Sequence, residues 1–142
     1  MKTMSKKPAS FSLGLVSVLT LFLLTANSAE KKVDVSKLPP PSDKKGVTYE
    51  KDIKPIFEKS CFKCHGPEKQ KGKMRLDSLE AALKGGENGP DIIKGDSAKS
   101  TLVHNVGRIG DEDDAMPPEG KGDPLTKEQV GLIRAWIDQG AK

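Results

Sequence analysis

Cys61, Cys64 and His65 are the residues of this chain whose types and spacing most clearly indicate chemistry. They stand in the order Cys-Phe-Lys-Cys-His, and the two cysteines are the only ones in the chain. Cysteines three positions apart on a helical turn face the same side, so both can reach one flat ligand, and the next residue holds its imidazole beside that ligand. This pattern is typical of covalent c-type haem attachment, with Cys61 and Cys64 as thioethers and His65 as an iron ligand.

Three other interpretations of the cysteines are weaker. A disulfide between Cys61 and Cys64 would close a very short loop and constrain little of the chain. A zinc site needs two more ligands, and elsewhere only His104 is a good candidate. A thioredoxin-like redox pair would need a βαβ context, which the sequence pattern does not indicate.

A second iron ligand is expected from Met116. Once residues 1–29 are set aside, Met74 and Met116 are the remaining methionines, and two prolines after Met116 restrict its backbone. A thioether ligand favours ferrous iron and raises the reduction potential. Two alternatives stay open: Met116 as an ordinary apolar loop residue, and His104 as the sixth ligand of a bis-histidine haem.

Residues 1–29 have the pattern of a secretory signal peptide. Three lysines precede an apolar run of about 15 residues, and small residues at 26–29 offer a cleavage site. The run is shorter than the roughly 20 residues that cross a bilayer as a helix. We therefore expect export to the periplasm, with membrane attachment only if the signal is retained. Export suits the haem prediction, because c-type haem is attached outside the cytoplasm.

The exported chain has little net charge. Three of the 24 Lys and Arg residues lie in 1–29, which contain no acid, so 21 basic residues face 20 acidic ones. No basic helix with interleaved aromatics is present, and we expect no nucleic-acid partner. Residues 30–46 are polar with three consecutive prolines, which predicts a semi-extended linker without its own core. Residues 47–142 then form one domain.

Two helices are expected in the first half of this domain. One covers residues 48–60 with Asp52 as N-cap, which leaves Pro55 in the first turn, where no N–H is needed. The next begins at Asp77, with Glu80 as its capping partner.

Two more helices are expected in the second half. One covers residues 97–106. The last has a capping box of Thr126 and Gln129 and ends at Gly140, and its apolar stripe contains Val130, Leu132, Ile133, Trp136 and Ile137. Since no sustained strand alternation occurs, the expected fold class is all-α.

Aromatic residues are too few for a large core. The chain has six, of which two lie in 1–29; those that remain are Tyr49, Phe57, Phe62 and Trp136. A haem would supply the missing apolar mass, and long loops would wrap it. We therefore expect about four short helices around one covalently bound haem, and an apo chain that is largely unfolded.

Over about residues 47–142 the chain resembles the planctomycete-type cytochrome c domain, a variant of the small class I c-type cytochromes. The resemblance implies that Cys61 and Cys64 carry haem c, that His65 is the proximal ligand and Met116 the distal one. It also implies a mostly α fold in which the first and last helices cross and Phe57 meets Trp136. The matching stretches are 52–57, 61–67, 71–78, 83–86, 116–118, 125–126 and 136–141.

The expected function is periplasmic one-electron transfer by a single haem with His/Met ligation. No acid–base dyad, nucleophile or phosphate loop is evident, so no substrate turnover is expected. We expect a monomer that exchanges electrons with redox partner proteins of unknown identity. Two alternatives are a five-coordinate gas-binding or sensing haem domain, and a haem subunit docked on a larger oxidoreductase.

Two charged stretches add weaker hints. Residues 58–75 hold six basic residues against two acidic ones, a patch that could steer an acidic redox partner or simply face solvent. The acidic run 111–114 could bind calcium but has no recognisable calcium-loop pattern.

Overall fold

The computed structural model describes residues 33–142, so the predicted signal peptide at 1–29 lies outside the described residues. The described part is helical and has no β-strand, which confirms the all-α class for it. None of its helices is long and apolar enough to cross a membrane. The α-helices are α1 (Lys54–Ser60), α2 (Phe62–His65), α3 (Leu79–Lys84), α4 (Thr101–Val106) and α5 (Lys127–Asp138). The other helical turns, four of them 3-10 and η2 a π-helix, are η1 (Val35–Lys37), η2 (Tyr49–Ile53), η3 (Lys71–Lys73), η4 (Ser97–Lys99) and η5 (Glu112–Asp114).

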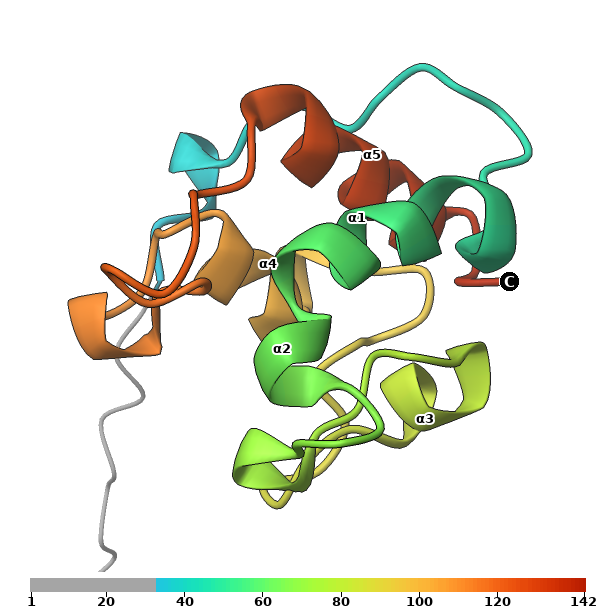
Figure 1. The fold of residues 1–142 in the computed structure, drawn as a ribbon. Helices are drawn as coiled ribbons and strands as arrows, with labels where there is room; N and C mark the ends of the chain where they lie inside the picture. Colours follow the sequence, from blue (N-terminus) through green and yellow to red (C-terminus); the bar gives the residue numbers. More distant parts are fainter. Residues whose placement is uncertain (1–32) are drawn as a thin grey trace, which may run out of the picture. The chain divides into compact units, whose positions relative to one another are not determined.

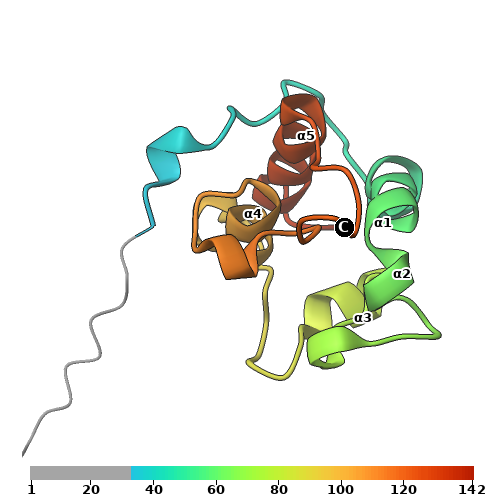
Figure 2. The same ribbon diagram turned by 60° about the vertical axis from the view of Figure 1, so that its left-hand side comes forward.

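The helices are short and the loops between them are long. Helix α2 follows α1 after a turn and lies below the end of α1 in Figure 1, α3 comes next along the chain, and α4 contacts α5 (Figures 1 and 2). The connections from α3 to α4 and from α4 to α5 are each longer than α3 or α4 itself. Long connections are uncommon in a self-sufficient helix bundle and often carry function.

The first expected helix, residues 48–60, is divided into the π-helical turn η2 and α1. Pro55 lies in the first turn of α1, as predicted, but the N-cap position is occupied by Ile53. The prediction of Asp52 as N-cap is wrong. Its carboxylate accepts the main-chain N–H of Thr48 at 2.9 Å and pairs with Lys44. Asp52 thus reaches back to the start of η2, as the acidic partner of a capping box does.

Helix α3 begins one residue later than predicted. The hydroxyl of Ser78 accepts the main-chain N–H of Ala81 at 3.3 Å, so Ser78 is the N-cap. The carboxylate of Asp77 instead accepts two hydrogen bonds from the Arg75 guanidinium, at 2.9 and 2.6 Å. Ser and Asp are both favoured N-caps, and the neighbouring arginine decides between them.

Helices α4 and α5 bury the expected apolar faces. Helix α4 begins at Thr101 rather than 97, because residues 97–99 form the separate turn η4. Helix α5 has the predicted capping box of Thr126 and Gln129, and Gly140 follows it with φ +99°. Leu132 is only half-buried, while the buried residues of the two helices include Leu102, Val103, Val106, Val130, Ile133, Trp136 and Ile137.

Three aromatic side chains pack together in the core. Tyr49 lies 5.8 Å from Trp136 and 6.3 Å from Phe57 between ring centroids. Phe57 and Trp136 meet edge to face, at 6.4 Å and 79°, which confirms the contact that the family resemblance implied. Such pairs contribute about 0.5–1.5 kcal/mol beyond their buried area. The Tyr49 hydroxyl also donates to the Leu76 carbonyl at 2.6 Å, so the buried phenol is satisfied.

The described part of the predicted linker packs against α5. Leu38 is 7% exposed and belongs to the core. The Ser42 N–H donates to the Gly131 carbonyl at 2.9 Å, and a Cβ at Gly131 would lie 2.8 Å from the Pro40 carbonyl oxygen. The linker interpretation therefore describes the composition of this stretch but not its packing, and the domain boundary at residue 47 stays a prediction.

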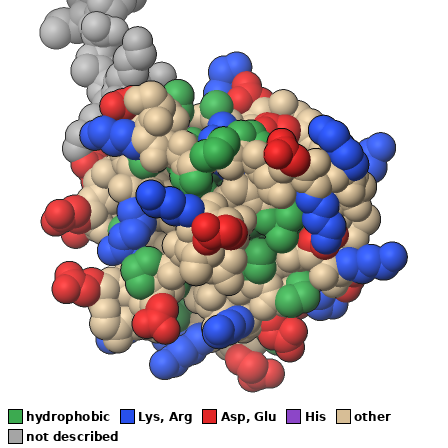
Figure 3. Space-filling model, turned by 90° about the horizontal axis from the view of Figure 1, so that it is seen from above, with side chains coloured by type: hydrophobic (Ala, Val, Ile, Leu, Met, Phe, Trp, Pro, Cys, Tyr) green, Lys and Arg blue, Asp and Glu red, His purple; other side chains and the backbone are tan. Residues whose placement is uncertain are grey.

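Charge is dispersed on the face that Figure 3 shows. Acidic and basic side chains alternate over it, with small hydrophobic areas between them. Among the described residues the large hydrophobic side chains with high exposure are Val35 and Ile93. Neither charge nor apolar surface therefore marks this face as a binding site.

Candidate functional site

The four residues that the sequence singles out line one cavity of about 350 Å³: Cys61, Cys64, His65 and Met116. Cofactor and ligand pockets have volumes of roughly 300–1,000 Å³. The first three residues come from the α1–α2 junction and α2, and Met116 comes from the loop before α5. The other lining residues are Ser60, Lys63, Lys71, Gly72, Asp113, Pro117, Pro118 and Lys121.

Main-chain hydrogen bonds at the junction of α1 and α2 fix the spacing of the motif. The Cys61 N–H donates to the Phe57 carbonyl at 2.7 Å and ends α1. The Cys61 carbonyl accepts the N–H groups of Cys64, at 3.0 Å, and of His65, at 2.8 Å. One carbonyl thus holds the other two motif residues on a single tight turn.

The two thiols are free and differ in burial. Cys61 is buried, Cys64 is half-buried, and no disulfide joins them. Burial raises the pKa of Cys61 to about 12, and the nearby Cys64 acts in the same direction. Reactive redox cysteines have lowered pKa values. The environment of Cys61 therefore argues against a thioredoxin-like pair.

His65 offers a neutral imidazole to the cavity. Burial lowers the pKa of its side chain, and the neutral form is the one that binds metals. Its Nδ1 atom is buried and has no hydrogen-bond partner within residues 33–142. A buried polar atom without a partner is costly, so this imidazole can take a further partner.

A hydrogen bond at His65 and a close backbone contact at Gly66 fix the turn after the motif. The His65 carbonyl accepts the Leu76 N–H at 2.7 Å. At Gly66 a Cβ would lie 2.4 Å from the Phe62 carbonyl oxygen. Only glycine fits so close an approach, and it lets the chain leave α2 directly after the histidine.

Met116 reaches the cavity from a loop that is tied to α4. Its N–H donates to the Asn105 carbonyl at 3.0 Å. The Arg108 guanidinium donates to the Pro117 carbonyl at 3.0 Å. The Met116 side chain is half-buried and packs against the hydrophobic core. These contacts give the thioether a defined location beside the cavity.

His104 lies at a different place. Its Nε2 atom is 2.6 Å from the Ala98 carbonyl oxygen. It lines a separate cavity of about 220 Å³ with Asn105 and Ile109, and none of the motif residues lines that cavity. The structure thus groups Met116, and not His104, with Cys61, Cys64 and His65.

Protein-only metal sites are absent from the described residues. No group of three or more His, Cys, Asp or Glu residues in 33–142 is arranged to hold a metal ion. Neither the zinc alternative nor calcium binding by the acidic run 111–114 therefore has a ligand cluster in the described part.

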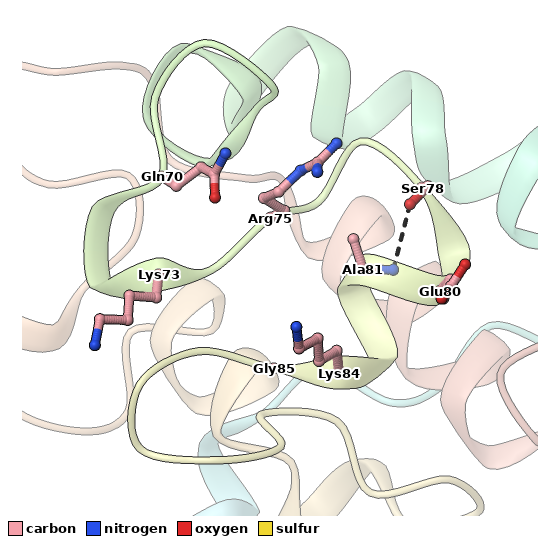
Figure 4. Close-up of a pocket in the computed structure, with 8 residues that line it drawn as sticks. All are labelled: Gln70, Lys73, Arg75, Ser78, Glu80, Ala81, Lys84 and Gly85. Carbon is pink, nitrogen blue, oxygen red and sulfur yellow. Dashed lines mark hydrogen bonds between the residues drawn. The ribbon is translucent and has the colours of Figure 1, made fainter.

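A second cavity of about 310 Å³ lies beside the first turn of α3 (Figure 4). Lys73, Arg75 and Lys84 are among its lining residues, and Glu80 is the acidic one. Figure 4 shows them on separate segments around the Ser78 cap. The Arg75 guanidinium is already engaged by Asp77 and holds the pKa of that carboxyl below its usual range.

Sequence reasoning missed several residues of the main cavity. Lys121 and Asp113 line it beside Lys63 and Lys71. Lys63 and Lys71 belong to the basic stretch 58–75, but nothing local in the sequence connects Lys121 with them. Its position follows from the path of the loop that carries Met116.

The donor set of this cavity fits a c-type haem. Two thiols on one turn can form two thioethers, a neutral imidazole follows directly, and a soft thioether comes from another segment. The two thioethers would hold the porphyrin, and an imidazole with a methionine thioether is the ligand pair that binds haem iron in cytochromes c. Burial also lowers the pKa of the His65 imidazole and so favours the neutral form, which is the form that binds metals.

Comparison with known proteins gives one match. Residues 61–120 match the model of the family described as Planctomycete cytochrome C, and the matched stretch contains the motif and Met116. No curated protein and no solved structure matches the chain. Haem-based electron transfer is the chemistry that this family assignment suggests. This match supports a planctomycete-type cytochrome c domain over residues 61–120.

Proposed function

We propose that the chain is a mono-haem c-type cytochrome that transfers single electrons. Cys61 and Cys64 hold haem c through thioethers, His65 is the proximal iron ligand and Met116 the distal one. The observation that supports this assignment is that these four residues line one cavity, whereas His104 lines another.

The haem supplies reversible one-electron chemistry when it is bound. The chain's residues set the conditions for it. His65 presents a neutral nitrogen, since burial lowers its pKa, and the soft thioether of Met116 favours the reduced state. If His65 and Met116 both bound the iron, they would leave no position for a substrate, so we expect electron transfer without substrate turnover.

We also propose that the protein acts in the periplasm, where residues 1–29 direct it, as a monomer that exchanges electrons with redox partner proteins. The basic stretch 58–75 contains the cavity-lining residues Lys63 and Lys71. Positive charge beside a redox site steers acidic partners. Exchange rates that fall as ionic strength rises would support this steering, and rates independent of salt would contradict it.

Covalent attachment is the direct test of haem binding. In a host that attaches c-type haem, the denatured wild-type protein should keep one haem, seen as the corresponding mass increase. The Cys61→Ala, Cys64→Ala double variant should carry none. Met74→Leu, a volume-conserving change outside the motif, is the matched control and should keep the haem. A wild-type protein without haem in that host would contradict the proposal.

A further inference from the structure

Three lysines from separate segments line the haem cavity proposed above. Lys63 lies in α2 and Lys71 in η3. Lys121 ends a turn in which its own N–H donates to the Pro118 carbonyl at 3.0 Å. Asp113 is the single carboxylate of the lining. Lys121 is 50 positions from Lys71 in the sequence, so only the fold brings their charges together.

These lysines are not engaged elsewhere in the described part of the chain. Other lysines form ion pairs there: Lys54 with Glu50 at 2.9 Å, and Lys99 with Asp96 at 2.8 Å. No such pair within residues 33–142 involves the lysines of the cavity. Three lysines and one aspartate give the lining residues a formal excess of two positive charges.

A haem carries two carboxylates, on the edge of its ring opposite the two vinyl groups that form thioethers. Lys63 stands between Cys61 and Cys64, which places it in the segment that binds the vinyl edge. Lys71 and Lys121 lie outside that segment, one after His65 and the other after Met116. Their two positive charges equal the two carboxylates in number and are opposite to them in sign.

We propose that Lys71 and Lys121 pair with the two haem carboxylates and keep them ionised. This inference rests on the proposed haem binding. A lysine within about 4–6 Å favours the charged form of a carboxylate and lowers its pKa by about 1–3 units. The paired carboxylates then bind no proton near neutral pH, and Asp113 is the lining group that opposes this effect.

The consequence is a reduction potential that does not change with pH near neutrality. Reduction removes one positive charge from the iron, so a carboxylate that can titrate binds a proton more readily in the reduced protein. The potential then falls as the pH rises through its pKa. Removal of a pairing lysine raises that pKa, and a pH-dependent segment should appear.

The test is the midpoint potential of the holoprotein between about pH 4 and pH 8, a range that covers the ordinary carboxyl pKa of about 4.3 and the higher values that burial causes. We expect a flat profile for the wild type. Lys71→Gln and Lys121→Gln should each show a potential that falls with rising pH, and Lys121→Arg should restore the flat profile. Lys63→Gln, from the same lining, and Lys94→Gln, from outside it, are the matched controls and should stay flat.

Failure of the proposed haem binding and failure of the lysine–carboxylate pairing would give different results. Wild-type protein without covalent haem would refute the proposed function. Haem-loaded Lys71→Gln and Lys121→Gln with flat profiles would overturn the pairing alone. Flat profiles together with slower, less salt-dependent exchange with an acidic redox protein would instead assign these lysines to partner docking. Equal pH dependence in Lys63→Gln would also overturn the specific roles of Lys71 and Lys121.

Discussion

At the scale of single residues, the distal ligand is the assignment that substitution can test most sharply. In Met116→Ala the haem should stay attached through Cys61 and Cys64, while the iron loses its sixth ligand. We expect a high-spin ferric form and carbon monoxide binding by the reduced protein at neutral pH. Optical spectra with and without carbon monoxide measure both.

His104→Ala is the matched control for that variant. His104 contacts the Ala98 carbonyl and lines another cavity. Its loss should leave the spectrum unchanged and lower the free energy of unfolding by about 1 kcal/mol, the usual contribution of one hydrogen bond. Carbon monoxide binding by His104→Ala, with none by Met116→Ala, would reverse the assignment.

Asp52 gives a prediction for the dependence of stability on pH. The pairing with Lys44, with the Thr48 N–H acting in the same direction, lowers the pKa of the Asp52 carboxyl in the folded protein. Its stabilisation is therefore present above the unfolded-state pKa and is lost as pH falls through the folded-state pKa. Asp52→Asn should be less stable than wild type at pH 7, and the difference should shrink in acid. Urea denaturation at a series of pH values measures it, and a difference that grows in acid would contradict the account.

At the scale of elements, the packed segment 33–46 makes a specific prediction. Leu38 is in the core, so Leu38→Ala should lower the free energy of unfolding by about 2–5 kcal/mol. Val35, from the same segment, is 42% exposed, and Val35→Ala should change it by less than about 0.5 kcal/mol. Denaturant unfolding of the two holoproteins compares them, and equal small effects would mean that the segment is a free linker.

Helix α5, helix α3 and the segment around Leu38 differ in how well the sequence alone predicts them. Helix α5 was predictable because the capping box of Thr126 and Gln129, the apolar stripe and Gly140 all agree. At α3 two adjacent N-cap residues compete, and the choice depends on Arg75, which no helix pattern includes. Leu38 is a lone apolar residue beside three prolines, so neither helical nor strand periodicity could reveal its burial.

The residues of the candidate site also differ in how far the sequence alone could predict them. Cys61, Cys64 and His65 are adjacent in sequence, so their spacing alone indicates their chemistry. Met116 could be proposed because few methionines remain, and its family pattern strengthened that hypothesis. Lys121 has no local signal, since its place beside Lys71 depends on the tertiary path of the loop after α4.

At the scale of the whole molecule, we expect folding to depend on the haem. The described domain has few aromatic residues, short helices and long loops around the cavity. The Cys61→Ala, Cys64→Ala double variant should therefore lose most of its native helicity in far-UV circular dichroism. Met74→Leu should retain it. Full native helicity in the double variant would show that the chain folds without its cofactor.

The optical spectrum of the purified wild-type holoprotein tests whether His65 and Met116 bind one covalently attached haem. The spectrum should be recorded in the ferric state and after dithionite reduction, with and without carbon monoxide. We expect a low-spin reduced form with a single c-type α band, a weak ferric band from methionine-to-iron charge transfer, and no change with carbon monoxide. A high-spin ferric form, or ready carbon monoxide binding at neutral pH, would contradict Met116 ligation and favour a gas-binding haem domain.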